Sequence, residues 1–169
     1  MINRRALLTA GVALGALAAM NKYGQAGTMT TAEKTIDYTK LSETEWRKRL
    51  DEAQFNVLRK HGTERAGTSP LNKEKRKGTF ACAGCDLPLF SSDTKFESGT
   101  GWPSFYQPLV DAVETKSDRS FFMTRTEVLC KRCEGHLGHV FDDGPKPTGL
   151  RYCMNGVAMK FVAEGRSSI

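Results

Sequence analysis

The most regular pattern of hydrophobic and polar positions in the chain begins at Ser42. Four apolar residues recur at helical spacing after it and form one stripe: Trp46, Leu50, Ala53 and Val57. Ser42 with Glu45 three residues later is typical of a capping box, and Gly62 follows the last turn. We therefore predict one helix between Ser42 and Gly62, with its apolar stripe packed on the core.

After Gly78 the pattern changes to short apolar runs separated by Gly, Pro, Ser and Asp, which is typical of compact antiparallel β structure. The polar stretch 116–120 predicts the turn of a hairpin. The candidate strands are residues 79–81, 109–114, 120–129, 140–141, 151–154 and 158–162. These runs predict a mainly β domain of the α+β type, in which the strands follow one helical segment along the chain.

The first twenty residues have the form of an export signal. Arg4 and Arg5 precede an apolar stretch, residues 6–20, which is shorter than the ~20 residues that span a bilayer. The arginine pair resembles the twin-arginine type of signal. We expect an export signal over residues 1–26, a flexible linker over 27–40 and one folded domain over 41–169, located in a bacterial periplasm with no stable membrane span after signal removal. An uncleaved signal that anchors the protein in the membrane is the alternative.

Length and charge narrow the classes of function. The 169 residues suffice for one domain plus a tail, with a core that needs no disulfides. The net charge is +6, but basic and acidic residues are interspersed, and the one dense basic run is residues 72–77. This run favours a solvated loop over a phosphate-binding patch, so we expect no nucleic-acid partner.

Four of the five cysteines form two C-x-x-C motifs, Cys82 with Cys85 and Cys130 with Cys133. This spacing lets a tight turn direct two sulfurs at one ion, and two such turns complete a tetrahedron. We predict one structural Zn²⁺ per chain on these thiolates, with two disulfides as the alternative in an oxidising compartment. His136 and His139, in "HLGH", are then surplus as ligands and free for other chemistry.

Cys153 has no partner in this scheme. If it lies on a strand, Arg151 and Asn155 share its face, while Tyr152 and Met154 point to the other side. A guanidinium near a thiol favours the thiolate, which is the nucleophilic form. The pattern thus predicts a reactive cysteine, although most free cysteines are small buried hydrophobes.

The stretch "GTGWPSF" contains two glycines and a proline, which shape a loop able to display Trp102 and Phe105. Such large rings can enclose an apolar group, for example the methyl of a thioether. Packing of Trp102 in the core is the alternative.

The chain resembles the type B family of peptide methionine sulfoxide reductases. The motifs that carry the resemblance are "GTFACAGCDLPLF", "KFESGTGWPSF", "RTEVLCKRCEGHLGHVFDDGP", "PTGLRYCMN" and a closing "MKF", in this order. The resemblance implies two antiparallel β-sheets with peripheral N-terminal helices, a structural Zn²⁺ on the four paired cysteines, and reduction of the R epimer of methionine sulfoxide in oxidised proteins or peptides.

The resemblance also implies roles for single residues. Cys153 corresponds to the family's nucleophile, which becomes a sulfenic acid. His139, assisted by His136, would donate a proton to the sulfoxide oxygen. Trp102 would hold the substrate's methyl group beside Phe105. Asn155 matches the family's catalytic asparagine. Arg151 would contact the substrate and adjust the pKa of the Cys153 sulfur.

Thr100 departs from the family pattern, because many members carry there the cysteine that resolves the sulfenic acid. We therefore expect recycling by an external thiol, from a thioredoxin-like protein or a small reductant, and we expect a monomer. Two other interpretations stay open: a zinc-ribbon module that binds nucleic acid or protein, and a cysteine-based peroxidase or redox sensor.

Overall fold

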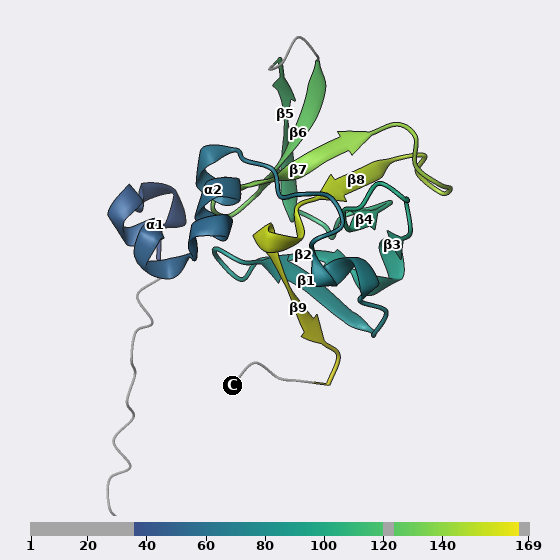
Figure 1. The fold of residues 1–169 in the computed structure, drawn as a ribbon, viewed down its shortest axis with the longest axis horizontal. Coiled ribbons are helices and arrows are strands. Elements are labelled where there is room, and N and C mark those ends of the chain that lie inside the picture. Colours follow the sequence, from purple (N-terminus) through teal and green to yellow (C-terminus); the bar gives the residue numbers. More distant parts are fainter. Residues whose placement is uncertain (1–35, 120–123, 166–169) are drawn as a thin grey trace, which may run out of the picture. The chain divides into compact units, whose positions relative to one another are not determined.

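The structure is a computed structural model and describes residues 36–119 and 124–165 (Figure 1). The predicted export signal, residues 1–26, and most of the predicted linker lie outside the described residues. Within the described ranges no helix combines the length and apolar character needed to cross a membrane.

Two helices occupy the segment for which we predicted one. α1 spans Glu43–Arg49 and begins with the predicted capping box of Ser42 and Glu45. Leu50 is extended, with φ −114° and ψ 144°, and Asp51 then starts α2, Glu52–Lys60, with a second capping box. A cap residue satisfies the free N–H groups of a new helix, which makes the break stable.

The break changes which residues face the core. Trp46, Leu50 and Val57 are buried as predicted, but the prediction for Ala53 is wrong, because the extended residue shifts the helical phase and leaves Ala53 exposed. Phe55 and Leu58 are buried instead. The left-handed residue that ends α2 is His61, with φ 56°, and not Gly62.

The ordered domain begins slightly before the predicted boundary. A 3₁₀ turn, η1 (Tyr38–Lys40), lies in the last three residues of the predicted linker, and the Tyr38 ring is 6.1 Å from the ring of Trp46. Three further 3₁₀ turns are η2 (Pro70–Lys73), η3 (Ser92–Thr94) and η4 (Gly156–Ala158).

The strands form two antiparallel sheets, which confirms the expected mainly β architecture. The three-stranded sheet has the order β2-β1-β9, and the six-stranded sheet has the order β3-β4-β8-β7-β6-β5. The strands are β1 (Gly78–Cys82), β2 (Pro88–Ser91), β3 (Lys95–Phe96), β4 (Ser104–Phe105), β5 (Val113–Asp118), β6 (Arg125–Cys130), β7 (His136–Phe141), β8 (Arg151–Met154) and β9 (Met159–Ala163).

Three of the six strand predictions agree with these bounds. The run 109–114 begins four residues before β5, the described part of 120–129 begins before β6, and 140–141 covers only the end of β7. Residues 151–154 are β8 as predicted, and β1 and β9 lie within one or two residues of their predictions. The predicted turn at 116–120 is wrong at its start, because β5 continues to Asp118, which pairs with Arg125 of β6. β2, β3 and β4 have four residues or fewer, too few for a periodic pattern to predict them.

Aromatic side chains join the two sheets. Phe105 of β4 stacks on Phe90 of β2 at 4.4 Å and meets the edge of Phe80 of β1 at 4.9 Å. All three side chains are fully buried. The predicted contact of Phe105 with a substrate is therefore corrected to a packing role in the core.

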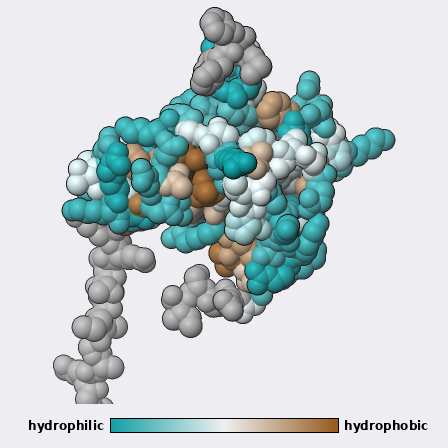
Figure 2. Space-filling view, in the orientation of Figure 1, coloured by the Kyte–Doolittle hydropathy of each residue, from teal (hydrophilic) through white to brown (hydrophobic). Residues whose placement is uncertain are grey.

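The surface of the described residues is largely hydrophilic on the face shown in Figure 2. Among them the exposed large hydrophobics are Ile36 and Val110. The basic run 72–77 lies on the surface, and its Lys75, Arg76 and Lys77 each pair with a carboxylate. This pairing agrees with the prediction of a solvated loop.

Candidate active site and metal centre

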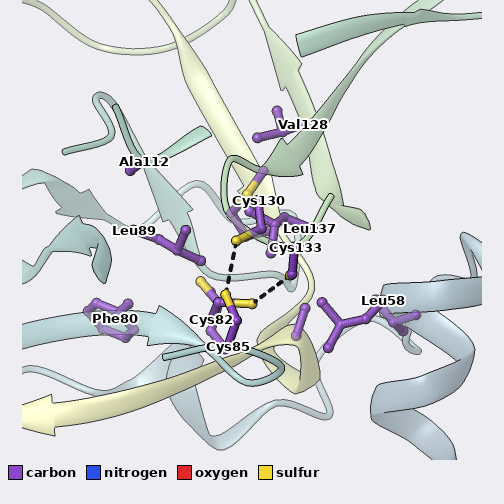
Figure 3. Packing of buried hydrophobic residues seen from close by; sticks show 14 of the residues in the cluster. Leu58, Phe80, Cys82, Cys85, Leu89, Ala112, Val128, Cys130, Cys133 and Leu137 are labelled. Atoms are coloured by element: carbon purple, nitrogen blue, oxygen red, sulfur yellow. Dashed lines mark hydrogen bonds between the residues drawn. The ribbon is translucent and has the colours of Figure 1, made fainter. Parts of the chain in front are cut away.

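The four paired cysteines converge at one point between the two sheets (Figure 3). Sγ of Cys82 lies 3.7 Å from Sγ of Cys133, and Sγ of Cys85 lies 3.5 Å from Sγ of Cys130. A tetrahedral ion with metal–sulfur bonds of ~2.3 Å needs sulfurs about 3.8 Å apart. All four residues are buried and none forms a disulfide, so the cluster fits the geometry of a metal site.

The two motifs fold into the same turn, one from each sheet. In each turn the residue after the second cysteine, Asp86 or Glu134, is left-handed, with φ 63° and 56°. In each, this residue donates its N–H to the carbonyl of the first cysteine, at 3.0 and 2.8 Å. Such a turn directs both sulfurs of a motif to the same side, as the spacing predicts.

Side chains around the cluster hold the two turns together. Arg132 donates to the carbonyl of Cys85 and Arg59 donates to that of Cys133, both at 2.8 Å. A side chain at Gly135 would collide with Leu58, which packs α2 over the second turn. α2 thus covers the second turn of the cluster.

The thiols of this cluster compete for protons. Hydrogen bonds from the other three hold the pKa of the Cys130 thiol well below its usual range, whereas hydrogen bonding to Cys130 raises the pKa of Cys82. Four thiolates at this separation repel one another, so all four can ionise together only if a cation compensates their charge.

Cys153, the fifth cysteine, lies away from this cluster at the centre of the six-stranded sheet. In β8 it stands directly opposite Ser104 of β4 and His139 of β7, and residues opposite each other share a face. Cys153 is half-buried and lines a cavity of about 120 Å³. The other lining residues are Thr63, Trp102, Arg125, Gly138, His139, Phe141 and Asn155.

A chain of hydroxyl groups reaches the sulfur from β4. Ser104 Oγ lies 2.7 Å from Ser98 Oγ, which lies 2.8 Å from Thr100 Oγ1. Thr100 Oγ1 is 3.8 Å from Sγ of Cys153. Thr100 is thus the residue through which this chain of hydroxyl groups contacts Cys153.

A β-bulge brings the two predicted histidines to the same side of β7. His136 pairs with Leu129 and His139 with Glu127, so four residues of β7 face three of β6. The imidazole rings lie 5.4 Å apart, edge to face. Gly138 permits the bulge, because a side chain there would collide with the carbonyl of Cys153.

The two histidines have different surroundings. His139 lines the Cys153 cavity, and its Nε2 lies 2.9 Å from Asp118, whose same oxygen accepts from Arg125 at 2.8 Å. His136 is buried beside the cavity without lining it, and its Nδ1 lies 2.6 Å from Glu127. Burial outweighs this bond and lowers the pKa of His136. Of the two, His139 is therefore placed to contact a bound molecule, with His136 against its ring.

Asn155 and Trp102 are both tied to Glu64, a residue that the sequence analysis did not identify. Glu64 N–H donates to Oδ1 of Asn155 at 3.0 Å, and Glu64 C=O accepts from Nε1 of Trp102 at 3.2 Å. The Glu64 carboxylate accepts from the N–H groups of Gly156 and Val157. Glu64 thereby fixes two walls of the cavity to the segment that follows Cys153.

The Asn155 amide has a further protein partner, because its Nδ2 donates to Leu137 C=O in the bulge at 3.1 Å. Its oxygen and one N–H are thus used within the protein. Asn155 lines the cavity, and the catalytic role predicted for it stays a prediction; these bonds hold β7 in place beside Cys153.

Arg151 lies on the same strand as Cys153 but outside the cavity lining. It forms two bonds of 2.8 Å with Asp143 and stacks over Phe141 at 4.4 Å. Hydrogen bonding to Asp143 raises the pKa of Arg151 against the effect of burial, and the sulfur of Cys153 adds to the rise. Arg151 therefore interacts with the sulfur electrostatically, while the structure does not place it against a substrate.

Four lining residues were also absent from the sequence-based prediction: Thr63, Arg125, Gly138 and Phe141. Phe141 could have been found, because it follows His139 by two positions and would share its face if the predicted strand 140–141 were extended back to His139. Thr63 and Arg125 carry no comparable signal, since only the tertiary fold brings their segments to Cys153.

Comparison with known proteins assigns most of the chain to one family. The family model described as the SelR domain matches residues 50–163. A protein of Pseudomonas putida named peptide methionine sulfoxide reductase MsrB is 59% identical over 135 residues, which cover 79% of this chain and 96% of that protein. Proteins of the same name from Leptospira interrogans and Methanosarcina barkeri are each 57% identical, over 73% and 79% of this chain and 95% and 92% of their own lengths.

Proposed function

Because the chain belongs to the SelR family and is a peptide methionine sulfoxide reductase of the MsrB type, we propose that the thiolate of Cys153 reduces the R epimer in oxidised proteins or peptides. One observation carries this proposal. The sulfur of Cys153 opens onto a cavity whose walls include Trp102, an aromatic ring for the methyl group, and His139, a proton donor.

In the proposed reaction the Cys153 thiolate attacks the sulfoxide sulfur while protonated His139 donates a proton to the sulfoxide oxygen. The attack forms a sulfur–sulfur bond between Cys153 and the substrate. This bond and the sulfur–oxygen bond of the substrate then break as the protonated oxygen moves to the sulfur of Cys153, which is left as a sulfenic acid. Methionine is released, its sulfur reduced by two electrons, and the cysteine sulfur is oxidised by two.

The neighbouring residues act through position and charge. Asp118 holds the imidazole of His139, and the ring of His136 packs against it. Asn155 fixes the bulge of β7, and Arg151 supplies positive charge near the sulfur. Trp102, held by Glu64, forms the wall for the methyl group.

Recycling in this proposal uses an external thiol. Thr100 occupies the position of the resolving cysteine, and its Oγ1 lies 3.8 Å from Sγ of Cys153. A hydroxyl cannot form a disulfide with that sulfur. The other four cysteines are buried in the metal cluster. A thioredoxin-like protein or a small thiol would therefore supply the two electrons that return the sulfenic acid to the thiol.

For the four-cysteine cluster we propose Zn²⁺, because zinc prefers four thiolates in a tetrahedron and has no redox chemistry of its own. Bound there, the ion would fasten the turns of the two sheets together. We expect about one zinc per chain and a large loss of thermal stability on chelation under reducing conditions. Two disulfides found by mass spectrometry in the freshly isolated protein would contradict this assignment.

We also propose that the protein is exported to a periplasm. The basic residues and apolar run of the first 26 positions motivate this proposal. Cell fractionation and sequencing of the mature N-terminus test it, and a cytosolic protein that retains Met1 would contradict it.

The separate R and S epimers of a methionine sulfoxide peptide test the proposed reaction, with dithiothreitol as reductant. We expect turnover of the R epimer alone, and none in Cys153→Ser at unchanged zinc content. If hydrogen peroxide oxidised Cys153 faster than the R sulfoxide did, the peroxidase or redox-sensor interpretation would be favoured instead. A folded, zinc-loaded protein inert on both epimers would favour the binding module.

A further inference from the structure

A second cluster of potential metal ligands lies beside the Cys153 cavity and away from the four cysteines. It consists of His61, at the end of α2, Glu127 of β6 and His136 of β7, whose ligand atoms all lie within 4.8 Å of one another. Nδ1 of His61 and Nδ1 of His136 each lie 2.6 Å from the same oxygen of Glu127. The end of α2 and the neighbouring strand β7 thus each bring an imidazole to one carboxylate oxygen of β6.

The cluster runs from the surface to the interior. The exposed fraction of the side chain is 60% for His61, 13% for Glu127 and 2% for His136. An ion arriving from solvent therefore meets His61 first and can keep water ligands on that side. His136, at the inner end, packs against the ring of His139 in the cavity.

The protonation states of the two inner groups suit a cation. Burial alone would raise the pKa of Glu127, but hydrogen bonds from both imidazoles outweigh it and lower the pKa, so the carboxylate is ionised. Burial lowers the pKa of His136, so its imidazole is neutral at neutral pH. A carboxylate and neutral imidazoles are the forms that bind a metal ion.

We propose that His61, Glu127 and His136 form a second, exchangeable site for a divalent transition-metal ion such as Zn²⁺, and that its occupation inhibits the enzyme. The inhibitory half rests on the proposed function, whereas the binding half does not. Two imidazoles and a carboxylate match the ligand preferences of Zn²⁺ and its transition-metal neighbours and not those of Mg²⁺ or Ca²⁺.

Inhibition follows from the shared histidine. An ion bound at Nδ1 of His136 replaces the hydrogen bond between His136 and Glu127. The two ligand atoms, 2.6 Å apart without the ion, must then move apart to the separation of neighbouring ligands in a metal coordination sphere. The ring of His136 then shifts against the ring of His139, which stands opposite Cys153. The site differs from the four-cysteine cluster in having three ligands and no thiolate, so its ion should be lost to a chelator first.

Zinc binding to the full-length holoprotein tests the site without any measurement of activity. The protein is first treated with a mild chelator that leaves one zinc per chain, and Zn²⁺ is then titrated against a coloured competitor. We expect one further zinc per chain. In His61→Asn its affinity should fall at least about tenfold, and Asn tolerates the left-handed backbone at this position. Cys153→Ser should bind the second zinc like the wild type.

The inhibitory half is tested in the same samples. The wild type should lose reductase activity over the range of free Zn²⁺ that fills the second site, whereas His61→Asn should retain activity there and show unchanged activity without added zinc. A wild type that takes up no further zinc, or whose second zinc depends on Cys153 and not on His61, would overturn the site. Equal inhibition of wild type and His61→Asn would overturn the inhibitory role, and an inert wild type with an intact second site would point to a failure of the proposed function alone.

Discussion

Removal of the Glu64 carboxylate should loosen the two cavity walls that Glu64 holds. The carboxylate accepts hydrogen bonds from the N–H groups of Gly156 and Val157, and the Glu64 main chain binds Asn155 and Trp102. No bond of the carboxylate itself reaches the cavity. Loss of the carboxylate therefore acts on the cavity indirectly, through the position of the segment that contains Gly156 and Val157.

The magnitude follows from the two N–H groups left without a partner. Gly156 is buried and Val157 is half-buried, and an unsatisfied donor costs about 1–3 kcal/mol. Glu64→Ala should lower the free energy of unfolding by about 2–4 kcal/mol. Glu64→Gln keeps one accepting oxygen and should lose roughly half as much.

The catalytic effect is measured apart from unfolding, at a temperature where each variant is folded. We expect kcat/KM for the R epimer to fall about tenfold in Glu64→Ala, about 1.4 kcal/mol of transition-state stabilisation, with an altered fluorescence of Trp102. Glu52→Ala removes an exposed carboxylate from the nearby helix α2 and is the matched control. Wild-type stability and kcat/KM in Glu64→Ala would refute the reasoning.

Three further perturbations test other parts of the site. Thr100→Cys should form a disulfide with Cys153 after one turnover without reductant, because Thr100 Oγ1 lies 3.8 Å from the sulfur; mass spectrometry that finds only sulfenic acid would contradict this. Gly138→Ala should lower kcat/KM by about a hundredfold or more at unchanged zinc content, because the new methyl collides with the carbonyl of Cys153 and displaces β7; wild-type kinetics would show that the bulge tolerates a side chain. The pKa of buried His136 is lowered from 6.5, so its contribution to stability is present above that pH and is lost as the pH falls below it. The free energy of unfolding between about pH 7 and about pH 5 should therefore decline less steeply in His136→Gln than in the wild type, and equal slopes in urea titrations would contradict this.

Local signals in the sequence predicted the elements that depend on local chemistry. The capping box at Ser42 and the strand at residues 151–154 were confirmed, because each needs only neighbouring residues. The second cap at Asp51 was missed, because the helical stripe through Leu50 looked continuous. Strands such as β4, of two residues, exist through their pairing with β8 and leave no pattern of their own.

The site shows the same division between local and tertiary information. The cysteine motifs and the histidine pair stood out by spacing, and the structure brings each set together. The residues that hold Asn155 and His136 in place were missed. They are Glu64 and Glu127, and only the folded chain brings them to these side chains. Phe105 was misassigned, because a large ring in a glycine-rich loop resembles a binding residue until the second sheet packs against it.

A single turnover without reductant tests the central claim most directly, which is that the sulfur of Cys153 takes the oxygen of the sulfoxide. Zinc-loaded protein is mixed with an excess of the R epimer, and peptides are mapped after trapping of sulfenic acid. We predict one methionine released per chain and one trapped sulfenic acid, located on Cys153, with neither product from the S epimer. Methionine released by Cys153→Ser, or oxidation confined to the metal-site cysteines, would contradict the account.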